Sequence, residues 1–326
     1  MTSRRRAILL TLALGVAASA ALDAHLLFGI RWPDGVMPIR YYVTNRDVPG
    51  VTALQLQTTA DRSFAAWTSV PNVTARSTFG GFVAANPLVA DGANVIGFLS
   101  RPDLEGVLGM ATFAVDEMSG AIVESDIFLN STFPWTIADV GDATRYDVQS
   151  VLTHEIGHLL GLGHSALGET QPVTGGRTVL AKRAVMFPIA YPRGNLEDRT
   201  LEADDVSGIA DVYGNAEARR TLGQISGRVT LNGAGVLGAH VTVFNPSTGS
   251  LYAGYSLDNQ GRFVIGGLPV GMYIVRAEPL DDIDLDSVFD DDVVININFR
   301  PIFYSKQVAV PAGGSGPSIE IKVRAK

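Results

Sequence analysis

The chain has 326 residues, enough for about two domains of roughly 150 residues each. It contains no cysteine, which excludes disulfides, thiolate metal sites and a cysteine nucleophile. A net charge of −8 provides no basic surface for a nucleic-acid partner, and a hydrophobic fraction of 46% with 35 glycines indicates a folded, turn-rich chain.

Residues 1–24 are typical of a signal peptide. Arg4, Arg5 and Arg6 form a basic end, residues 7–18 are apolar, and small residues precede a cleavage site after Ala20. The apolar run is shorter than the ~20 residues of a membrane-spanning helix. We therefore expect a secreted, extracellular protein, which would associate with a membrane only if this segment stayed uncleaved.

Strand and helix patterns alternate between residues 25 and 216. Apolar and alternating runs predict strands at 39–43, 95–99, 109–115 and 122–129. Apolar residues at helical spacing predict helices at 54–70, 144–160 and 201–213. Thr144 and Asp147 have the spacing of a capping box, so we expect the second helix to begin at Thr144.

The pattern changes near residue 223. Helical periodicity ends, and short alternating runs at 225–231, 240–244, 261–265 and 272–277 are separated by Gly, Asn and Pro. This spacing predicts a small all-β sandwich over residues 223–326, joined to the first domain by a linker at 217–222.

Three histidines and one glutamate occur in a short segment of the second predicted helix. His154 and His158 are four residues apart, so both imidazoles project from one helix face and can supply two zinc ligands. Gly161 can end the helix with a positive φ and turn the chain back, so that His164 completes a three-nitrogen site. Glu155 is not needed as a ligand and can take a proton from water.

Two plainer interpretations compete with a catalytic site. In the first, the histidines are unrelated core or surface residues. In the second, they hold a structural metal, although structural zinc normally has a fourth protein ligand. The combined spacing favours catalysis, with a fourth coordination position open to water.

Residues 154–165 resemble the extended zinc-binding motif of the metzincins, and Ser165 after the third histidine is similar to the matrixin branch, the matrix-metalloproteinase-like peptidases. Residues 185–191 resemble the methionine turn of that branch. Residues 201–214 resemble its closing helix, and the residues around Trp32 and Trp67 resemble its start. The resemblance covers about residues 30–214.

The resemblance implies a secreted zinc endopeptidase of zincin-type α+β fold, with a twisted mixed sheet and two main helices. His154, His158 and His164 would hold one catalytic Zn²⁺, with Glu155 as general base. Met186 would form the floor beneath the metal, and Pro188 and Tyr191 would line the substrate pocket. An edge strand near residues 109–115 would pair with an extended protein or peptide substrate.

The C-terminal region resembles the carboxypeptidase regulatory-like, or transthyretin-like, sandwich, best over residues 223–280. Its expected role is accessory: adhesion, docking or support of the fold. The run 281–292 contains seven aspartates, which favours a solvated acidic loop over a calcium loop.

Further ligands and partners follow from the remaining residues. His25 and His240 are expected to be solvated, which leaves one zinc. Calcium is an open alternative at scattered acids, for which solvated positions are favoured: Asp116, Asp126, Asp139 and Asp142. Asp204 and Asp205 suit either a freed N-terminal amine or the helix dipole. A monomer is assumed, and the alternative function is an inactive binding or adhesion protein.

Overall fold

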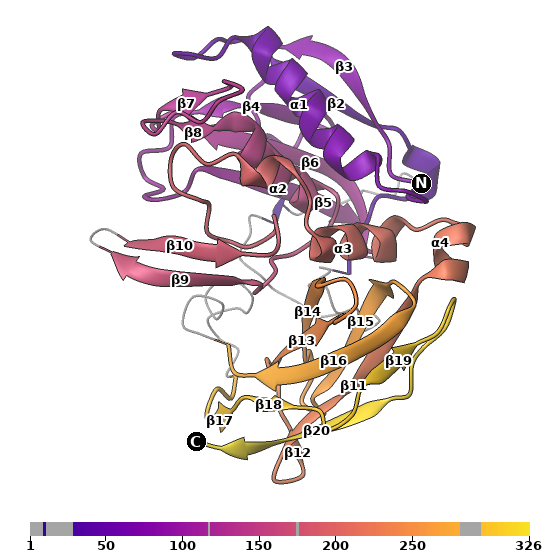
Figure 1. Ribbon diagram of the computed structural model, residues 1–326. Helices are drawn as coiled ribbons and strands as arrows, with labels where there is room; N and C mark the ends of the chain where they lie inside the picture. The colour runs from indigo at the N-terminus through magenta and orange to yellow at the C-terminus, as the bar shows by residue number, and fades with distance from the viewer. Residues whose placement is uncertain (1–8, 11–28, 117, 174–175, 281–294) are drawn as a thin grey trace.

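The computed structural model describes residues 9–10, 29–116, 118–173, 176–280 and 295–326. The signal segment and the acidic run 281–292 lie almost entirely outside these residues. The described chain forms two bodies, each with its own hydrophobic core, one drawn from residues 32–213 and the other from residues 225–323. Figure 1 shows helix α3 (Ala203–Tyr213) between them.

A six-stranded sheet forms the first body, in the order β1-β5-β6-β4-β2-β3. Strand β5 is antiparallel to β6, while the pairs from β6 through β3 are parallel, so the sheet is mixed. Its strands are β1 (Leu9–Leu10), β2 (Ile39–Thr44), β3 (Ser77–Val83), β4 (Asn94–Leu99), β5 (Gly109–Asp116) and β6 (Ala121–Asn130). This mixed sheet with few helices is consistent with the expected zincin-like α+β fold.

Two helices, α1 (Ala53–Thr68) and α2 (Val148–Leu159), pack on this sheet and on each other. Helix α1 begins with a capping box between Thr52 and Gln55, and it buries its apolar face, including Phe64 and Trp67. Trp67 Nε1 donates a hydrogen bond to Thr153 O at 2.8 Å. The first helix therefore fixes the backbone of the second beside the predicted metal ligands.

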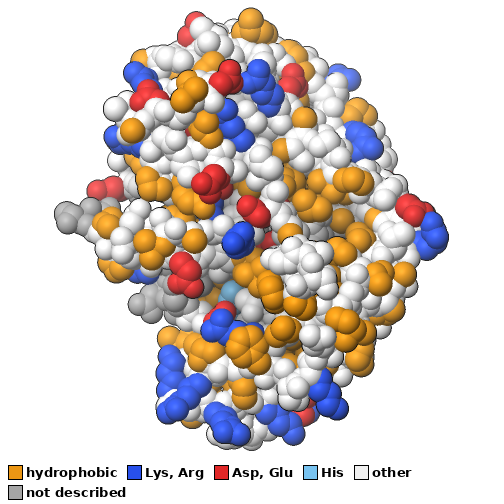
Figure 2. Space-filling view, in the orientation of Figure 1, with side chains coloured by type: hydrophobic (Ala, Val, Ile, Leu, Met, Phe, Trp, Pro, Cys, Tyr) orange, Lys and Arg blue, Asp and Glu red, His pale blue; other side chains and the backbone are white. Residues whose placement is uncertain are grey.

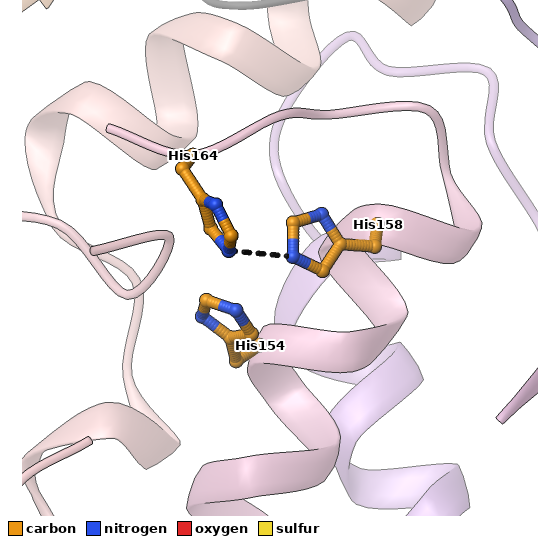
Figure 3. A group of neighbouring side chains, drawn as sticks. All are labelled: His154, His158 and His164. Carbon is orange, nitrogen blue, oxygen red and sulfur yellow. Dashed lines mark hydrogen bonds between the residues drawn. The ribbon is translucent and has the colours of Figure 1, made fainter. Parts of the chain in front are cut away.

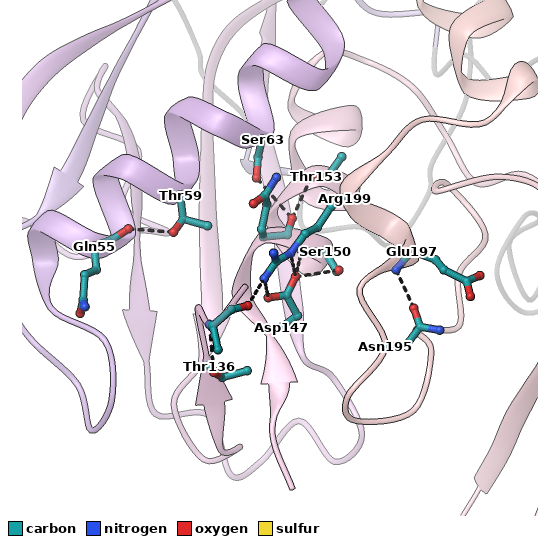
Figure 4. Close-up of polar contacts among 12 residues, drawn as sticks. Gln55, Thr59, Ser63, Thr136, Asp147, Ser150, Thr153, Asn195, Glu197 and Arg199 are labelled. Atoms are coloured by element: carbon teal, nitrogen blue, oxygen red, sulfur yellow. Dashed lines mark hydrogen bonds and ion pairs between the residues drawn. The ribbon is translucent and has the colours of Figure 1, made fainter. Parts of the chain in front are cut away.

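Helix α2 begins later than the sequence pattern predicts. Residues 146 and 147 form strand β8, and Thr144 lies in the preceding turn, where its hydroxyl donates to Asp142. Asp147 is the N-cap, accepting from the Ser150 amide at 2.8 Å. The predicted start at Thr144 is wrong. The Asp147 carboxylate also forms an ion pair with Arg199, in which Arg199 Nη2 lies 2.6 Å from Asp147 Oδ1, and this pair favours Asp147 as the N-cap (Figure 4).

Short elements complete the first body. The segment after His164 forms a hairpin of β9 (Gly168–Val173) and β10 (Gly176–Lys182). Strand β7 (Trp135–Thr136) pairs with β8 (Tyr146–Asp147), and the 3-10 helices are η1 (Asp34–Val36) and η2 (Glu197–Arg199). Most of the expected linker 217–222 belongs to helix α4 (Ala216–Thr221), which Asn215 caps, and its assignment as the boundary between domains stays a prediction.

Two five-stranded sheets face each other in the second body and enclose its core. We refer to this body as the C-terminal sandwich. The first sheet contains β11 (Gly223–Leu231), β12 (Ala234–Gly235), β15 (Arg262–Leu268), β17 (Phe299–Arg300) and β20 (Ile319–Ala325). The second contains β13 (His240–Phe244), β14 (Leu251–Tyr255), β16 (Gly271–Glu278), β18 (Ile302–Phe303) and β19 (Val308–Val310). Its resemblance to a carboxypeptidase regulatory-like domain stays a prediction.

Two side chains that were expected to be solvated are buried. His240 is 5% exposed, and its Nδ1 lies 3.4 Å from Glu278, because β13 turns it toward its neighbour β16. Asp126 is 2% exposed and accepts the amide hydrogens of Val89 and Val95. These two predictions are wrong, whereas His25 lies outside the described residues. In the part of the chain that the structure describes, no helix has the length and apolar character needed to cross a bilayer.

Candidate metal centre

Helix α2 and the turn after it bring three imidazoles together. His154 and His158 lie one turn apart on α2, with ring centroids 4.7 Å apart. The helix ends at Leu160, and Gly161 adopts φ +93°, which turns the chain back toward the helix. His164 then faces the same point, with its ring centroid 4.7 Å from that of His158 (Figure 3).

Gly161 is needed for its space as well as for its φ. A Cβ at this position would lie 2.5 Å from Ile30 O, which is closer than non-bonded atoms approach. The N-terminal segment of the first body thus passes directly against the turn. Any side chain here would push the third histidine away from the first two.

Backbone carbonyls orient the two helical imidazoles. His154 Nδ1 lies 2.8 Å from Val185 O, and His158 Nδ1 lies 2.8 Å from Leu162 O. A carbonyl oxygen only accepts, so each Nδ1 carries the hydrogen and each Nε2 keeps its lone pair. His158 Nε2 lies 3.1 Å from His164 Nε2 (Figure 3).

The donor set fits zinc. One nitrogen from each ring lies within 4.8 Å of the others, and this is the one such group of His, Asp or Glu among the described residues. Two nitrogens bound tetrahedrally to zinc at their usual ~2.05 Å are about 3.3 Å apart, close to the observed separation. Burial and the nearby imidazoles lower the pKa of His158 to about 3, and the pKa of His154 is also well below its usual value. The two helical rings, His154 and His158, are therefore neutral, as metal ligands must be.

Glu155 lies on α2 between the two ligands but faces strand β5. Its side chain is buried, and burial raises the pKa of its carboxyl to about 8, while a hydrogen bond from the Ala111 backbone opposes the shift. Gly109 makes room for it, because a Cβ there would lie 3.1 Å from Glu155 Oε1. The carboxyl thus lies between the metal centre and the edge of the sheet.

Met186 lies against helix α2, and its expected role as the floor beneath the metal stays a prediction. A Cβ on Gly157 of α2 would meet its sulfur at 2.3 Å, so the helix rests directly on the thioether. Asp205 holds this turn by accepting the amide hydrogens of Val185 and Met186 at 2.8 and 3.1 Å. Through Val185 O, the turn therefore supplies one of the carbonyls that orient the imidazoles.

Pro188 and Tyr191 follow this turn and are both half-buried. Lys182 Nζ lies 5.0 Å from the centre of the Tyr191 ring and pairs with Asp198 at 2.6 Å. A cavity beside the metal centre is lined by Met186 together with the loop around His164, and neither Pro188 nor Tyr191 is among its walls. Their assignment to a substrate pocket stays a prediction.

Sequence reasoning missed the residues that support the ligands. No local pattern indicates that Val185 O orients His154, because the two are 31 residues apart. Sequence reasoning also did not find Lys182. The one available indication was a lysine in the predicted loop before the methionine turn, and this signal is weak. Figure 2 shows a histidine side chain reaching the surface in the recessed middle of the molecule.

The chain is similar to a known protein family. The family model of the matrixins matches residues 31–214, which is more than half of the chain. This chain belongs to the matrixin family. Membership implies zinc at the histidine triad of this matrixin, and it accounts for the first body of the structure but not for the C-terminal sandwich.

Plant and animal relatives match shorter parts of this matrixin. Metalloendoproteinase 1-MMP of Arabidopsis thaliana is 34% identical over 113 residues, covering 34% of this chain and 25% of the relative. Metalloendoproteinase 1 of Glycine max is 39% identical over 80 residues, covering 23% and 21%. Matrilysin of Rattus norvegicus is 35% identical over 74 residues, covering 23% and 22%. The chain thus matches only about a quarter of the length of these relatives.

Proposed function

We propose that this matrixin is a secreted zinc endopeptidase. The observation that carries the proposal is the convergence of three imidazoles next to the buried carboxyl of Glu155, which is not one of the three ligands. Three protein ligands leave a position for water, which distinguishes catalytic from structural zinc. The names of the relatives, metalloendoproteinases and matrilysin, support the same activity.

His154, His158 and His164 would hold the metal through their ring nitrogens. Zinc held in this way supplies Lewis acidity, which polarises a peptide carbonyl and acidifies water. Beside the positive charge of a bound zinc ion, Glu155 would lose the proton that its burial favours, and its carboxylate would then accept the proton of the attacking water and return it to the leaving amine. Its burial next to Ala111 keeps the carboxyl away from bulk water, so the proton passes between the reactants and Glu155.

Strand β5 would bind the substrate. Its outer edge pairs antiparallel with Leu9–Leu10, so this edge accepts an added extended strand. A peptide on the same edge would run beside Gly109 and Ala111. Both residues lie next to the Glu155 side chain. Met186, Pro188 and Tyr191 would then form the floor and wall of the pocket next to the scissile bond.

Replacing Glu155 tests the proposal. Glu155→Gln is expected to keep bound zinc and to lower kcat for a fluorogenic peptide by about 10²–10⁴-fold, because the amide cannot accept the proton. Zinc content by mass spectrometry and peptide cleavage are measured on the same sample. Glu217→Gln, on the exposed side of α4, is the matched control and should cleave normally. Unchanged cleavage by Glu155→Gln would overturn the role of this residue.

The second candidate is an inactive binding or adhesion protein, and the appended C-terminal sandwich favours it. Cleavage that is lost with a chelator and returns with added zinc excludes this candidate. Zinc bound tightly without any cleavage of a peptide library supports it.

Secretion, the division into domains and calcium binding also remain proposals. Removal of the first 20 residues in exported protein, measured by intact mass, tests the signal peptide. Among the acids named for calcium, Asp126 uses its carboxylate on backbone amides, which leaves it poorly suited to a cation.

A further inference from the structure

The third ligand lies where the two bodies of the molecule meet. The loop carrying His164 and Ser165 lines a cavity together with Asp204 of α3 and with Ala253 and Tyr255 of strand β14. Strand β14 belongs to the C-terminal sandwich and packs against α3. The loop of the candidate metal centre and the C-terminal sandwich therefore line the same cavity.

Asp204 links the two bodies by its two carboxylate oxygens. Oδ2 accepts from Ser165 Oγ at 2.7 Å, and Oδ1 accepts from the backbone N–H of Ala253 at 2.9 Å. All three residues are buried, at 8%, 3% and 3% exposure for Ser165, Asp204 and Ala253. Charge-assisted hydrogen bonds away from water are stronger than neutral ones, so this carboxylate ties β14 to the residue that follows His164.

A second contact reaches the ligand itself. The hydroxyl of Tyr255 donates to His164 O at 3.4 Å, and the buried Tyr255 ring packs with Ala166. The next residue, Leu167, packs with Ala184 and Ala253. The sandwich thus contacts His164 and the residues that directly follow it.

We propose that the C-terminal sandwich is a positioning element for the metal centre: Tyr255 and the Ser165–Asp204–Ala253 contacts hold His164 in place. The two helical ligands gain their positions from α2, but a loop ligand must have its backbone fixed by other contacts. Fixing the backbone of a loop residue costs conformational entropy, which these contacts offset before metal binds. Partners that orient a metal ligand typically change metal affinity or activity by about 10–100-fold.

This inference rests on the proposed zinc centre, and its test separates the two. The variants are Ser165→Ala, which removes the donor to Asp204, and Tyr255→Phe, which removes the hydroxyl and keeps the ring. Ser207→Ala is the matched control, because Ser207 Oγ donates from the same helix to Gly266 O of the sandwich at 2.8 Å. Full-length proteins are compared.

The measurements are zinc affinity by competition with a chromophoric chelator, the visible spectrum after cobalt substitution, and the unfolding midpoint. Ser165→Ala should weaken zinc binding about tenfold and shift the cobalt bands, and Tyr255→Phe should do so about threefold, in line with partners that orient ligands. Ser207→Ala should lower the midpoint only.

Two outcomes overturn the claims separately. If Ser165→Ala and Tyr255→Phe lower only the midpoint, as Ser207→Ala does, the sandwich merely supports the fold and the positioning role is wrong. If the unmodified protein binds no zinc, the proposed metal centre itself fails.

Discussion

The imidazole cluster is supported differently on its two sides. His154 and His158 stand on α2, whose start is capped by Asp147 and whose middle accepts a hydrogen bond from Trp67. His164 stands in a loop, between the methionine turn, α3 and the C-terminal sandwich. A helix fixes the spacing of two ligands by its own geometry, whereas a loop ligand depends on contacts with distant parts of the chain.

The helix side is the stiffer of the two. Asp147 is 4% exposed and pairs with both Nε and Nη2 of Arg199, which also donates to Ala138 O (Figure 4). The loop side relies on single hydrogen bonds, including Ser165 N to Met186 O at 2.9 Å. This difference predicts that changes on the helix side affect global stability, whereas changes on the loop side affect metal binding.

The largest effect is expected from the helix side. Arg199→Ala leaves the Asp147 carboxylate buried without its cation and should cost about 3–5 kcal/mol of unfolding free energy, measured by urea denaturation. Arg220→Ala, which breaks the exposed pair with Glu217, is the control and should change little. Equal losses in the two variants would contradict the view that α2 is anchored by this pair.

The pH dependence of stability probes the loop side. Burial raises the pKa of Asp205 to about 7, so the folded state holds this proton more tightly than the unfolded state, whose pKa is about 4. The resulting stabilisation is complete below pH 4 and is lost as pH rises through 7. Asp205→Asn removes the titration.

Chemical denaturation of both proteins in chelator, between pH 4 and 7.5, checks this prediction. The stability of the unmodified protein should fall relative to Asp205→Asn by up to about 4 kcal/mol across the range. The variant is less stable overall, because an amide offers one acceptor oxygen to the Val185 and Met186 amides. Parallel pH curves would refute the role of Asp205 as a buried titrating group.

The smallest effect on stability, and the sharpest comparison, comes from two glycines with similar backbone angles. Gly161 has φ +93° and Gly92 has φ +85°, but only at Gly161 does an added Cβ meet a neighbouring atom, Ile30 O. Both alanine variants should lose about 1–2 kcal/mol from backbone strain. Gly161→Ala should also weaken zinc binding, measured by chelator competition, because it displaces the turn to His164. Equal zinc affinities would show that the turn tolerates the shift.

The sequence predicts much of the first body because its signals are local. The apolar faces of α1 and α2 and the four-residue spacing of His154 and His158 each depend on residues within one or two turns. The start of α2 was placed too early because Thr144 and Asp147 both qualify as caps locally. Arg199, 52 residues away, favours Asp147.

By itself, the sequence determined which three histidines form the candidate metal centre, the glycine turn between them and the change from a mixed α+β body to strands. Only the tertiary structure decided what holds His164 in place. Asp204 lies 39 residues from Ser165 and 49 from Ala253, and such pairs carry no periodic signal in a single sequence. Burial also reversed the expected surroundings of His240 and Asp126, because exposure depends on which strands pack together and not on residue type.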